Sequence, residues 1–307
     1  MQLSVIIACL NAEDTIGIQL SALQHQVWNK SWEILIVDNG CTDRTLEIVE
    51  SYQTQLPNLR VVDASDKKGA GHARNIGVRE AKGELILFCD SDDKVHDGWV
   101  AKMGDALESF DFIAGALNLQ DLNAGWRIPK NHPLGSRTAP QQQLPRYRHA
   151  RELKYAPTAN LGVRKSIHST IGGFDEDLIY NQDLEYCLRT QLAGYPLHFV
   201  PDAIVEYRLK HSLRKTFIQF YRWGRYGILV YRRHIGKGSL VDRLRFIFGG
   251  WRHLPLQIIK VRNKADVFEL CAWLGGRFGE IVGCWEFLIM QPETKLSKNL
   301  SGAVKSN

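Results

Sequence analysis

The residues best suited to chemistry are four polar side chains that directly follow an apolar run. Residues 85–89 are apolar, and Asp90, Ser91, Asp92 and Asp93 come next. This pattern predicts a strand buried on both faces, with three carboxylates at the carboxyl edge of a sheet, where open α/β folds bind ligands. Mg²⁺ or Mn²⁺ prefers oxygen ligands and bridges carboxylates to phosphates. For a lone Asp-Ser-Asp segment, a turn that caps the next helix is the alternative.

Similar transitions from strand to polar loop occur earlier in the chain. Strands are predicted at residues 3–9, 33–38 and 59–63, each followed by a polar loop and a helical pattern. This alternation indicates a parallel sheet that is covered by helices on both faces. The loops would bring more polar side chains to the same edge and form a crevice of nucleotide size: Asn11, Glu13, Asp38 and Asn39.

The loop after the third strand has the sequence Gly69-Ala-Gly-His-Ala-Arg74-Asn. Its backbone amides and the Arg74 guanidinium are suited to contact with phosphate or base. It is not a P-loop, because it lacks Gly-Lys-Ser/Thr. It also departs from a dinucleotide-binding fingerprint, because Arg74 stands where the third glycine belongs.

Length and composition limit the classes of protein to which the chain can belong. The chain has 307 residues, of which 44% are hydrophobic and 23% charged, which suits one large domain or a domain with an extension. It contains no run of 18 uncharged apolar residues and no signal peptide, so neither secretion nor membrane spanning is expected. The six cysteines include no Cys-x-x-Cys pair. Reduced thiols and a cytoplasmic location are therefore predicted.

The charge is distributed unevenly. Residues 208–264 hold fifteen Lys and Arg against one acid, Asp242, a net charge of +14, while the rest of the chain carries −8. We therefore expect two parts that face different partners: a first domain at residues 1–208 and a basic, apolar helical extension at 209–307, with a flexible tail from about residue 292.

The extension is predicted to contain an amphipathic helix at residues 213–233 with a basic face. A second helical stretch, 266–290, has glycines spaced by four, which permits close approach of another helix. The alternatives are packing alone, a nucleic-acid surface and an anionic membrane surface. The membrane surface is favoured and nucleic acid is not expected.

The middle of the chain is less regular. Residues 111–119 and the segment 156–166 indicate strands, whereas residues 121–157 have no period and predict a long loop. A helix begins at Gln182 and Asp183. Carboxylates at a helix N-terminus are also common for structural reasons alone.

Five segments in this order resemble the family 2 glycosyltransferases of GT-A fold, over about residues 1–225. They are Asn11 and Glu13; VDNGCTD at 37–43; ARNIG at 73–77 with AKG at 81–83; CDSDD at 89–93; and GGFDE at 172–176 with NQD at 181–183. The chain departs from the family pattern at Leu10, where many members have an aromatic residue, at Cys41 in place of Ser, and at Gln182 in place of Glu.

The resemblance implies a Rossmann-like, mostly parallel sheet and an inverting transfer of a sugar from a UDP- or GDP-sugar to an acceptor hydroxyl. It implies Asp183 as general base, and Asp90, Asp92 and His211 as ligands of Mg²⁺ or Mn²⁺. A solvated surface histidine is the alternative for His211. The implied nucleotide-sugar-binding residues are Leu10, Asn11, Glu13, Asp38, Asn39, Gly69, Arg74, Asp90 and Ser91.

The acceptor expected from the resemblance is a saccharide or a lipid-linked saccharide, in the synthesis of cell-envelope or extracellular polysaccharide or glycolipid. Peripheral attachment to the inner face of the cytoplasmic membrane would suit such an acceptor. A phosphatase with an Asp-x-Asp nucleophile is rejected, because Lys94 stands where that class has Thr or Val. A non-catalytic nucleotide-sugar-binding or scaffold protein of the same fold remains the alternative, favoured by Gln182 alone.

Overall fold

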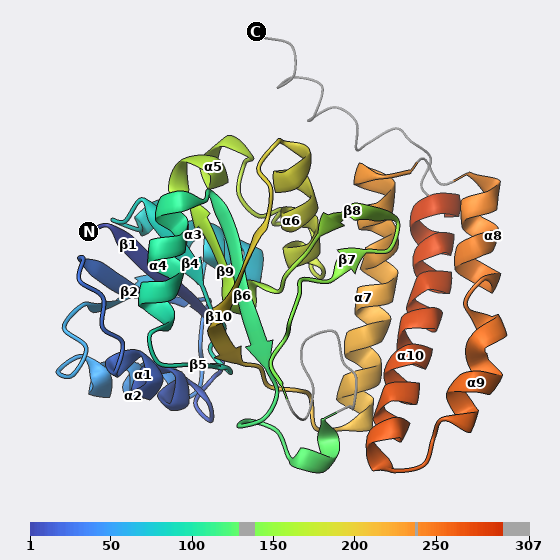
Figure 1. Ribbon diagram of the computed structural model, residues 1–307, viewed down its shortest axis with the longest axis horizontal. Coiled ribbons are helices and arrows are strands. Elements are labelled where there is room, and N and C mark those ends of the chain that lie inside the picture. Colours follow the sequence, from blue (N-terminus) through green and yellow to red (C-terminus); the bar gives the residue numbers. More distant parts are fainter. Residues whose placement is uncertain (129–138, 237–238, 291–307) are drawn as a thin grey trace, which may run out of the picture. The chain divides into compact units, whose positions relative to one another are not determined.

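A computed structural model of the chain describes residues 1–128, 139–236 and 239–290 (Figure 1). The chain separates into two compact units, Met1–His211 and a second that begins at Ser212. The boundary predicted from the charge distribution, after residue 208, lies close to this point. The predicted tail from about residue 292 lies outside the described residues, as does part of the predicted loop at 121–157.

The first unit is built on a sheet of eight strands, counted over the described residues, in the order β3-β2-β1-β4-β9-β6-β10-β5. Parallel pairs join β3, β2, β1 and β4, and also β6 and β10, whereas β9 and β5 run antiparallel to their neighbours. The sheet is therefore mostly parallel, as predicted. Its strands are β1 (Leu3–Cys9), β2 (Trp32–Asp38), β3 (Leu59–Asp63), β4 (Leu85–Phe88), β5 (Lys94–Val95), β6 (Phe112–Asn118), β9 (Leu161–Arg164) and β10 (His198–Glu206).

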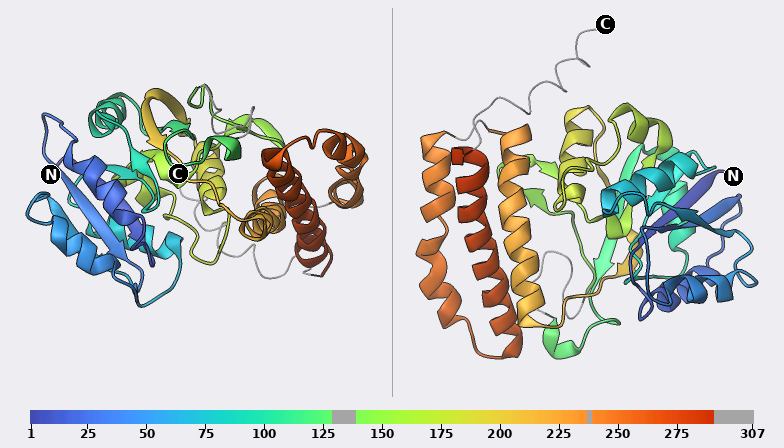
Figure 2. Two further views of the ribbon diagram at one scale, coloured as in Figure 1. Left: turned by 90° about the horizontal axis from the view of Figure 1, so that it is seen from below. Right: turned by 180° about the vertical axis from the view of Figure 1, so that it is seen from behind.

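Helices cover both faces of this sheet (Figures 1 and 2). On β1, Val5 and Ile7 belong to one hydrophobic cluster and Ile6 to the other, and on β4, Leu87 and Phe88 divide in the same way. Side chains alternate between the faces of a strand, so continuous apolar runs bury both faces. The first cluster includes α1 (Ile16–Gln24), α2 (Thr45–Tyr52) and α4 (Trp99–Ser109); the second includes α3 (Ala70–Glu80), α5 (Lys165–Thr170) and α6 (Gln182–Leu192).

Some elements differ from the sequence prediction. The described part of residues 121–157 includes a small antiparallel hairpin, β7 (Arg146–Tyr147) and β8 (Ala150–Lys154), and a 3₁₀ turn, η1 (Gly125–Arg127). A second 3₁₀ turn, η2 (Thr158–Asn160), precedes β9. The sequence did not indicate β10, because Pro201 falls within it and its pairing with β6 shifts register between Val200 and Ile204.

A network of polar side chains holds the loop before α6 to helix α3. Asn75 donates to the Phe174 carbonyl oxygen at 2.9 Å and accepts from the Phe174 amide at 2.8 Å. His72 lies between two carboxylates, with Nδ1 3.0 Å from Glu176 and Nε2 2.9 Å from Asp66. These contacts fix the loop that leads to Asp183.

The second unit is helical over its described residues. It contains α7 (Leu213–His234), α8 (Leu240–Phe248), the 3₁₀ turn η3 (Trp251–His253), α9 (Leu254–Ile259), α10 (Lys264–Gly283) and the π-helix η4 (Cys284–Met290). Capping boxes begin two of these helices, with Ser239 and Asp242 at α8, and Asn263 and Asp266 at α10. Among the described helices, none combines the length and apolar character needed to cross a bilayer.

Helices α7 and α10 pack backbone to backbone through glycines. A Cβ atom added at Gly279 would overlap the Tyr221 carbonyl oxygen, and one added at Gly275 would lie 2.6 Å from the Phe217 carbonyl oxygen. Both distances are shorter than real Cβ contacts. The spacing of four between these glycines therefore serves close helix packing.

Replacing Gly279 should separate this helix pair. We expect Gly279→Ala to destabilise the protein by about 1–3 kcal/mol, because the new methyl group meets backbone atoms that cannot rotate away. The matched control is Gly276→Ala on the same helix, where an added Cβ meets nothing within 4 Å. Because alanine favours helix, the control should stabilise by about 0.5–1 kcal/mol. Calorimetric melting of both variants measures this, and equal melting temperatures would contradict it.

Stability should also depend on pH through the His72 network. Burial opposes a charge on His72, but hydrogen bonds to Asp66 and Glu176 outweigh it and raise the His72 pKa above 6.5. This contribution is complete below pH 6.5 and is lost as pH rises through the raised pKa. Burial likewise opposes the charge on Glu176, but hydrogen bonds from Asn75, Lys67 and His72 lower its pKa from 4.5 to about 2. That contribution is present above pH 4.5 and is lost as pH falls toward 2.

Urea unfolding at a series of pH values measures both effects. We expect His72→Gln to flatten the alkaline decline in the free energy of unfolding, because glutamine can hydrogen-bond but does not titrate. The acid decline should remain in this variant, since Glu176 keeps its bonds from Asn75 and Lys67. A variant profile parallel to that of the wild type across the alkaline range would show that His72 does not carry this dependence.

Candidate functional site

Three carboxylates converge where β4 ends. Each of Asp90, Asp92 and Asp93 offers an oxygen, and these oxygens lie within 4.8 Å of one another. Asp93 is buried, whereas Asp90 and Asp92 are half-buried. The cluster forms because the apolar strand β4 delivers consecutive residues to the sheet edge, as the sequence predicted.

The charges of this cluster strongly affect one another. Burial raises the pKa of Asp90, and the charge of Asp92 adds to the shift, while Arg74 opposes it. Burial also raises the pKa of Asp93, and the charges of Asp92 and Asp90 add to it. Two cations offset part of this repulsion. Arg74 donates to Asp90 Oδ1 at 2.9 Å, and the Lys210 ammonium lies 3.4 Å from Asp92 Oδ2.

Asp93 provides a test of whether these residues suit a divalent cation. Its Oδ1 accepts from the Arg208 backbone amide at 2.9 Å, while its Oδ2 is buried without a hydrogen-bond partner among the described residues. A buried carboxylate oxygen without a partner is costly. Three neighbouring carboxylates, one of them buried with an unsatisfied oxygen, form a donor set that suits Mg²⁺ or Mn²⁺. The residues present therefore fit such an ion.

The implied third ligand, His211, is exposed and is not part of the ligand group found among the described residues. Asp93 occupies a place in that group instead. A ligand role for His211 stays a prediction.

Asp183 lies in the first turn of α6. Burial raises its pKa, and the charges of Arg74 and Asp90 act on it in opposite directions, so the structure brings Asp183 near the acidic cluster. Asp183 Oδ1 accepts the Leu184 amide hydrogen at 2.8 Å. This bond is the helix-terminus contact expected from a purely structural role, and it uses one carboxylate oxygen.

The two residues before Asp183 are constrained. Asn181 has a φ of 61°, in the left-handed region. Asn11, on the loop after β1, also lies in this region, with a φ of 52°. Strained conformations of this kind often occur in functional loops. Gln182 is buried against α3, since a Cβ added at Gly71 would lie 2.7 Å from Gln182 Nε2. The glutamine that replaces the family's glutamate therefore faces the Gly-rich loop.

The loops after β1 and β2 are tied to each other. Asn11 Oδ1 accepts the Thr42 amide hydrogen at 2.8 Å, and Glu13 Oε2 accepts the Arg44 amide hydrogen at 3.0 Å. The Cys41 sulfur accepts the Asn11 amide hydrogen at 3.3 Å. Polar atoms of Asn11 and Glu13 thus position the edge of the site.

Asp38 and Asn39 also make internal contacts. Asp38 Oδ1 accepts amide hydrogens from Gly40 and Cys41, and Asn39 is buried with its amide donating to the Ala64 carbonyl oxygen. Asn39 Oδ1 accepts the Gly69 amide hydrogen at 2.7 Å. These bonds hold the Gly-rich loop against β2, and Asn39 has no exposed surface to offer a ligand.

The remaining sequence-predicted residues are placed as follows. Leu10 is 50% exposed on the loop after β1, which leaves its side chain open to a planar ligand. Gly69 begins α3 with a φ of 143°, and an added Cβ there would meet nothing within 4 Å. Ser91 is half-buried. Arg74 is buried, and its guanidinium carbon lies 5.7 Å from the centre of the Phe174 ring. Its ion pair with Asp90 supports the carboxylates.

Two tyrosines near the carboxylates were missed by sequence reasoning. Burial raises the pKa of Tyr207, and the charges of Asp93, Asp90, Asp92 and Asp183 raise it further. Burial also raises the pKa of Tyr155, with Asp183 adding to the shift. Tyr207 follows β10, whose interrupted pattern concealed it. No signal in the sequence marks Tyr155, which lies in the irregular region.

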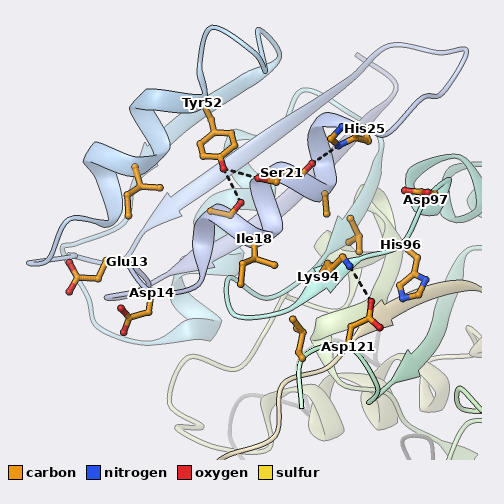
Figure 3. Close-up of a pocket in the computed structure, with 15 residues that line it drawn as sticks. Glu13, Asp14, Ile18, Ser21, His25, Tyr52, Lys94, His96, Asp97 and Asp121 are labelled. Atoms are coloured by element: carbon orange, nitrogen blue, oxygen red, sulfur yellow. Dashed lines mark hydrogen bonds and ion pairs between the residues drawn. The ribbon is translucent and has the colours of Figure 1, made fainter. Parts of the chain in front are cut away.

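A cavity of about 810 Å³ has a lining that does not include Asp90, Asp92 or Asp93 (Figure 3). Its lining comes from α1, α2, β5 and the loops beside them, and Glu13 is the sequence-predicted residue that reaches it. In the cavity wall Lys94 pairs with Asp121 at 3.1 Å, and the Tyr52 hydroxyl lies 2.7 Å from Ser21 Oγ.

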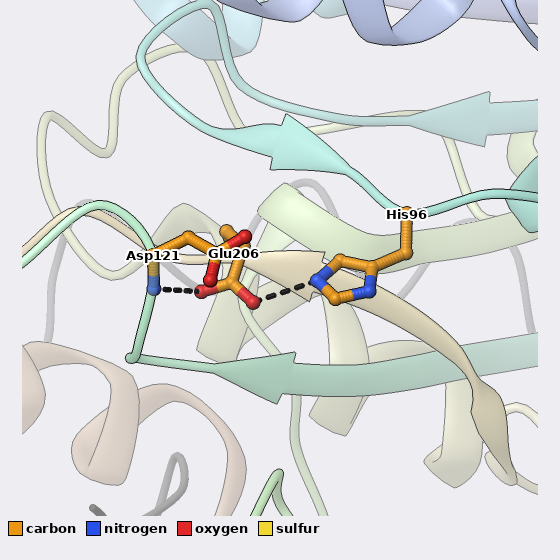
Figure 4. A group of neighbouring side chains, drawn as sticks. All are labelled: His96, Asp121 and Glu206. Carbon is orange, nitrogen blue, oxygen red and sulfur yellow. Dashed lines mark hydrogen bonds and ion pairs between the residues drawn. The ribbon is translucent and has the colours of Figure 1, made fainter.

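A second group of potential ligands, His96, Asp121 and Glu206, joins β5 to β10 (Figure 4). His96 Nε2 lies 2.6 Å from Glu206 Oε1, and the Asp121 amide donates to Glu206 Oε2 at 3.0 Å. Asn118 also donates to Glu206 at 2.5 Å. Both oxygens of the buried glutamate therefore have protein partners, so the group has a structural role and links β10 to the segments that contain His96 and Asp121.

Comparison with known proteins identifies the family. The model of the family described as "Glycosyl transferase family 2" matches residues 4–172, more than half of the chain. The glycosyltransferase AglE of Haloferax volcanii is 29% identical over 204 residues, which are 66% of this chain and 65% of that protein. The poly(ribitol-phosphate) beta-N-acetylglucosaminyltransferase TarS of Staphylococcus aureus is 40% identical over 98 residues, 31% of this chain and 17% of TarS. The chain thus spans less than two thirds of either relative.

Solved structures agree on the fold. TarS residues 1–349 with UDP superimposes with a TM-score of 0.57 at 19% identity, covering 91% of this chain and 90% of that one. The mannosyltransferase PcManGT of Pyrobaculum calidifontis, in complex with GDP-Man and Mn²⁺, gives 0.66 at 15% identity, covering 93% and 88%. The matching family model, the ordered motifs and the sheet that positions them lead to one conclusion: the chain belongs to glycosyl transferase family 2 and has the GT-A fold.

Proposed function

We propose that this protein is an inverting, metal-dependent glycosyltransferase that moves a sugar from a UDP- or GDP-sugar to an acceptor hydroxyl. The observation that carries the proposal is the pairing of the Asp90, Asp92 and Asp93 cluster with Asp183, a carboxylate near it whose pKa is raised. The proposal is supported by solved neighbours in complex with UDP-GlcNAc or with GDP-Man and Mn²⁺.

The residues divide the work of an in-line displacement. Asp90 and Asp92 would hold a Mg²⁺ or Mn²⁺ ion, which supplies charge neutralisation for the leaving diphosphate. Asp183 accepts the proton of the acceptor hydroxyl as the hydroxyl oxygen bonds to the anomeric carbon and the bond to the diphosphate breaks. One base suffices for inversion. Burial suits Asp183 to this role, because a raised pKa makes the carboxylate a stronger base.

The donor's nucleotide would lie at the loops that follow β1 and β2. Leu10 is exposed and can contact the base. Asp38 Oδ2 can accept a hydrogen bond from a ribose hydroxyl, since the backbone amides that donate to Asp38 bond to Oδ1. The Asn11, Glu13 and Asn39 side chains keep these loops in register. Arg74 acts through Asp90, since it pairs with that carboxylate.

The proposed setting is the synthesis of cell-envelope or extracellular polysaccharide or glycolipid. The enzyme is placed in the cytoplasm, attached peripherally to the inner face of the cytoplasmic membrane, with a saccharide or lipid-linked acceptor. The net charge of +14 on residues 208–264 and the relation to a poly(ribitol-phosphate) transferase support this setting.

A non-catalytic nucleotide-sugar-binding protein is the second candidate, favoured by Gln182 in place of the family's glutamate. Screening nucleotide-sugars for Mn²⁺-dependent release of the nucleoside diphosphate decides between the two. Turnover of any donor excludes the binding protein, whereas donor binding without turnover across the screen, with saccharide and lipid-linked acceptors present, supports it.

Asp92→Ala should abolish metal-dependent donor binding and turnover. Its partner Lys210 and Asp92 itself are 40% and 36% exposed, so the lost ion pair contributes only about 0–1 kcal/mol. Removing one of three repelling carboxylates should keep the melting temperature equal or raise it. The readouts are turnover and the thermal shift caused by nucleotide-sugar with Mn²⁺. Asp202→Ala, which removes an exposed carboxylate of β10, is the control. Normal turnover of Asp92→Ala, or full wild-type activity in excess EDTA, would refute the metal role.

Asp183→Asn tests the general base separately. Asparagine can still accept the Leu184 amide hydrogen, so the helix start is kept while the proton acceptor is lost. We expect turnover to fall by ~10²–10⁴-fold with the donor dissociation constant nearly unchanged. Stopped assays and donor titration measure the two quantities. Loss of donor binding together with a lower melting temperature would instead assign Asp183 a structural role.

A further inference from the structure

Helix α8 and the short helix α9 present a row of large apolar side chains to solvent. We call this surface the α8–α9 face. Its exposed fractions range from 48% at Leu244 to 73% at Val241. The members of the face are Leu240, Val241, Leu244, Phe248, Leu256, Ile258 and Ile259. Exposed apolar residues are common singly, but seven large ones within residues 240–259 favour an interaction surface.

Helix α8 is amphipathic with two occupied faces. At 100° per residue its four exposed apolar side chains lie within about 100° of one another. Phe246 points the other way, is buried, and meets the Tyr231 ring at 5.0 Å. The helix is therefore anchored to its own unit through one side, and the exposed row is not needed for that anchoring.

The charges around this face are almost all positive. Four exposed cations lie on or beside it: Arg245, Arg252, Lys260 and Arg262. Between residues 208 and 264 the only acid is Asp242. The Asp242 carboxylate closes the capping box with Ser239, at 3.0 Å from the Ser239 amide, so it is already engaged in holding the helix start. A surface with this charge repels a basic partner and attracts an anionic one.

Helix α7, the basic helix indicated by the sequence, uses two of its arginines inside the unit. Arg225 makes a double contact with Glu286, at 2.6 and 2.7 Å, and Arg232 donates to the Phe287 carbonyl oxygen. In Figures 1 and 2, α10 runs between α7 and the column formed by α8 and α9. Two sides of α10 are thus occupied.

We propose that the α8–α9 face is the surface by which this protein lies on an anionic lipid bilayer. The apolar side chains of the face enter the boundary between headgroups and acyl chains, while Arg245, Arg252, Lys260 and Arg262 contact lipid phosphates. The helices lie along the surface, in keeping with the absence of a spanning helix from the described residues. The inference rests on the peripheral attachment proposed above and names the surface responsible, which differs from the face of α7 that the sequence indicated.

Co-sedimentation of the full chain with vesicles tests the proposal. The vesicles contain phosphatidylcholine alone or with phosphatidylglycerol. Wild type should bind the anionic vesicles, and binding should weaken as salt rises. Leu244→Glu with Phe248→Glu should weaken binding at least tenfold, and so should Lys260→Glu with Arg262→Glu. These residues are exposed, so far-UV circular dichroism and melting should match wild type.

Two matched variants locate the surface. Val27→Glu introduces the same charge at an apolar side chain that is 80% exposed in the first unit, and it should leave binding unchanged. Arg214→Ala with Lys215→Ala removes exposed cations of α7 and should reduce binding less than twofold. If the α7 variant loses binding while both α8–α9 variants keep it, attachment stands and the assignment of the surface is overturned.

The remaining outcomes also test the proposal. If wild type binds neither kind of vesicle, membrane attachment itself fails. If wild type is dimeric in solution and Leu244→Glu with Phe248→Glu is monomeric, the face joins two copies and the proposal is overturned. Thermal shift with nucleotide-sugar and Mn²⁺ is measured on the same samples. Lipid binding without a donor response would refute the proposed enzyme activity and leave the membrane surface standing.

Discussion

The crowding of Asp90, Asp92 and Asp93 is the constraint on which the first unit depends. Their oxygens lie within 4.8 Å of one another in a partly desolvated place, where like charges repel strongly. Two protein cations, Arg74 and Lys210, are placed against this cluster and relieve part of the repulsion. The repulsion that remains contributes to the raised pKa values of Asp90 and Asp93. Asp93 Oδ2 has no hydrogen-bond partner among the described residues. A cation that binds this site relieves the repulsion among the carboxylates, so cation binding also stabilises the folded protein.

The surrounding structure keeps the cluster from relaxing. Asp93 is fixed by the Arg208 amide, and the Arg208 side chain donates to the Asp92 carbonyl oxygen at 2.8 Å. Asp183 is held at the start of α6 by a loop that Asn75 and His72 bind to α3. Carboxylates that would otherwise move apart are thus held by contacts from Arg208, which follows β10, and from side chains of α3. Rigid supports of this type are what preorganised electrostatic sites require.

Much of this arrangement follows from local sequence. The strand that precedes Asp90 and the helix that begins at Gln182 were predictable, because apolar runs and helix starts are short-range signals. Tyr207, Lys210 and Arg208 were not, since they reach the site only through β10, where Pro201 and a register shift break the alternation. For the helical unit, the sequence identified amphipathic character on α7. Which apolar face remains open depends on the glycine contacts between α7 and α10, and such contacts are long-range.

The cysteines of the first unit have a further consequence for the protein's reactivity. Burial is the largest cause of a raised thiol pKa at Cys9, Cys41, Cys89 and Cys187, so little thiolate forms at neutral pH. Thiolate is the species that attacks alkylating reagents and peroxides. The loop joined by the Cys41 sulfur and the Asn11 amide is thus protected from electrophiles by its own environment. Sulfur at position 41, in place of the family's hydroxyl, therefore supplies a hydrogen-bond acceptor without making the edge of the site a target for oxidation.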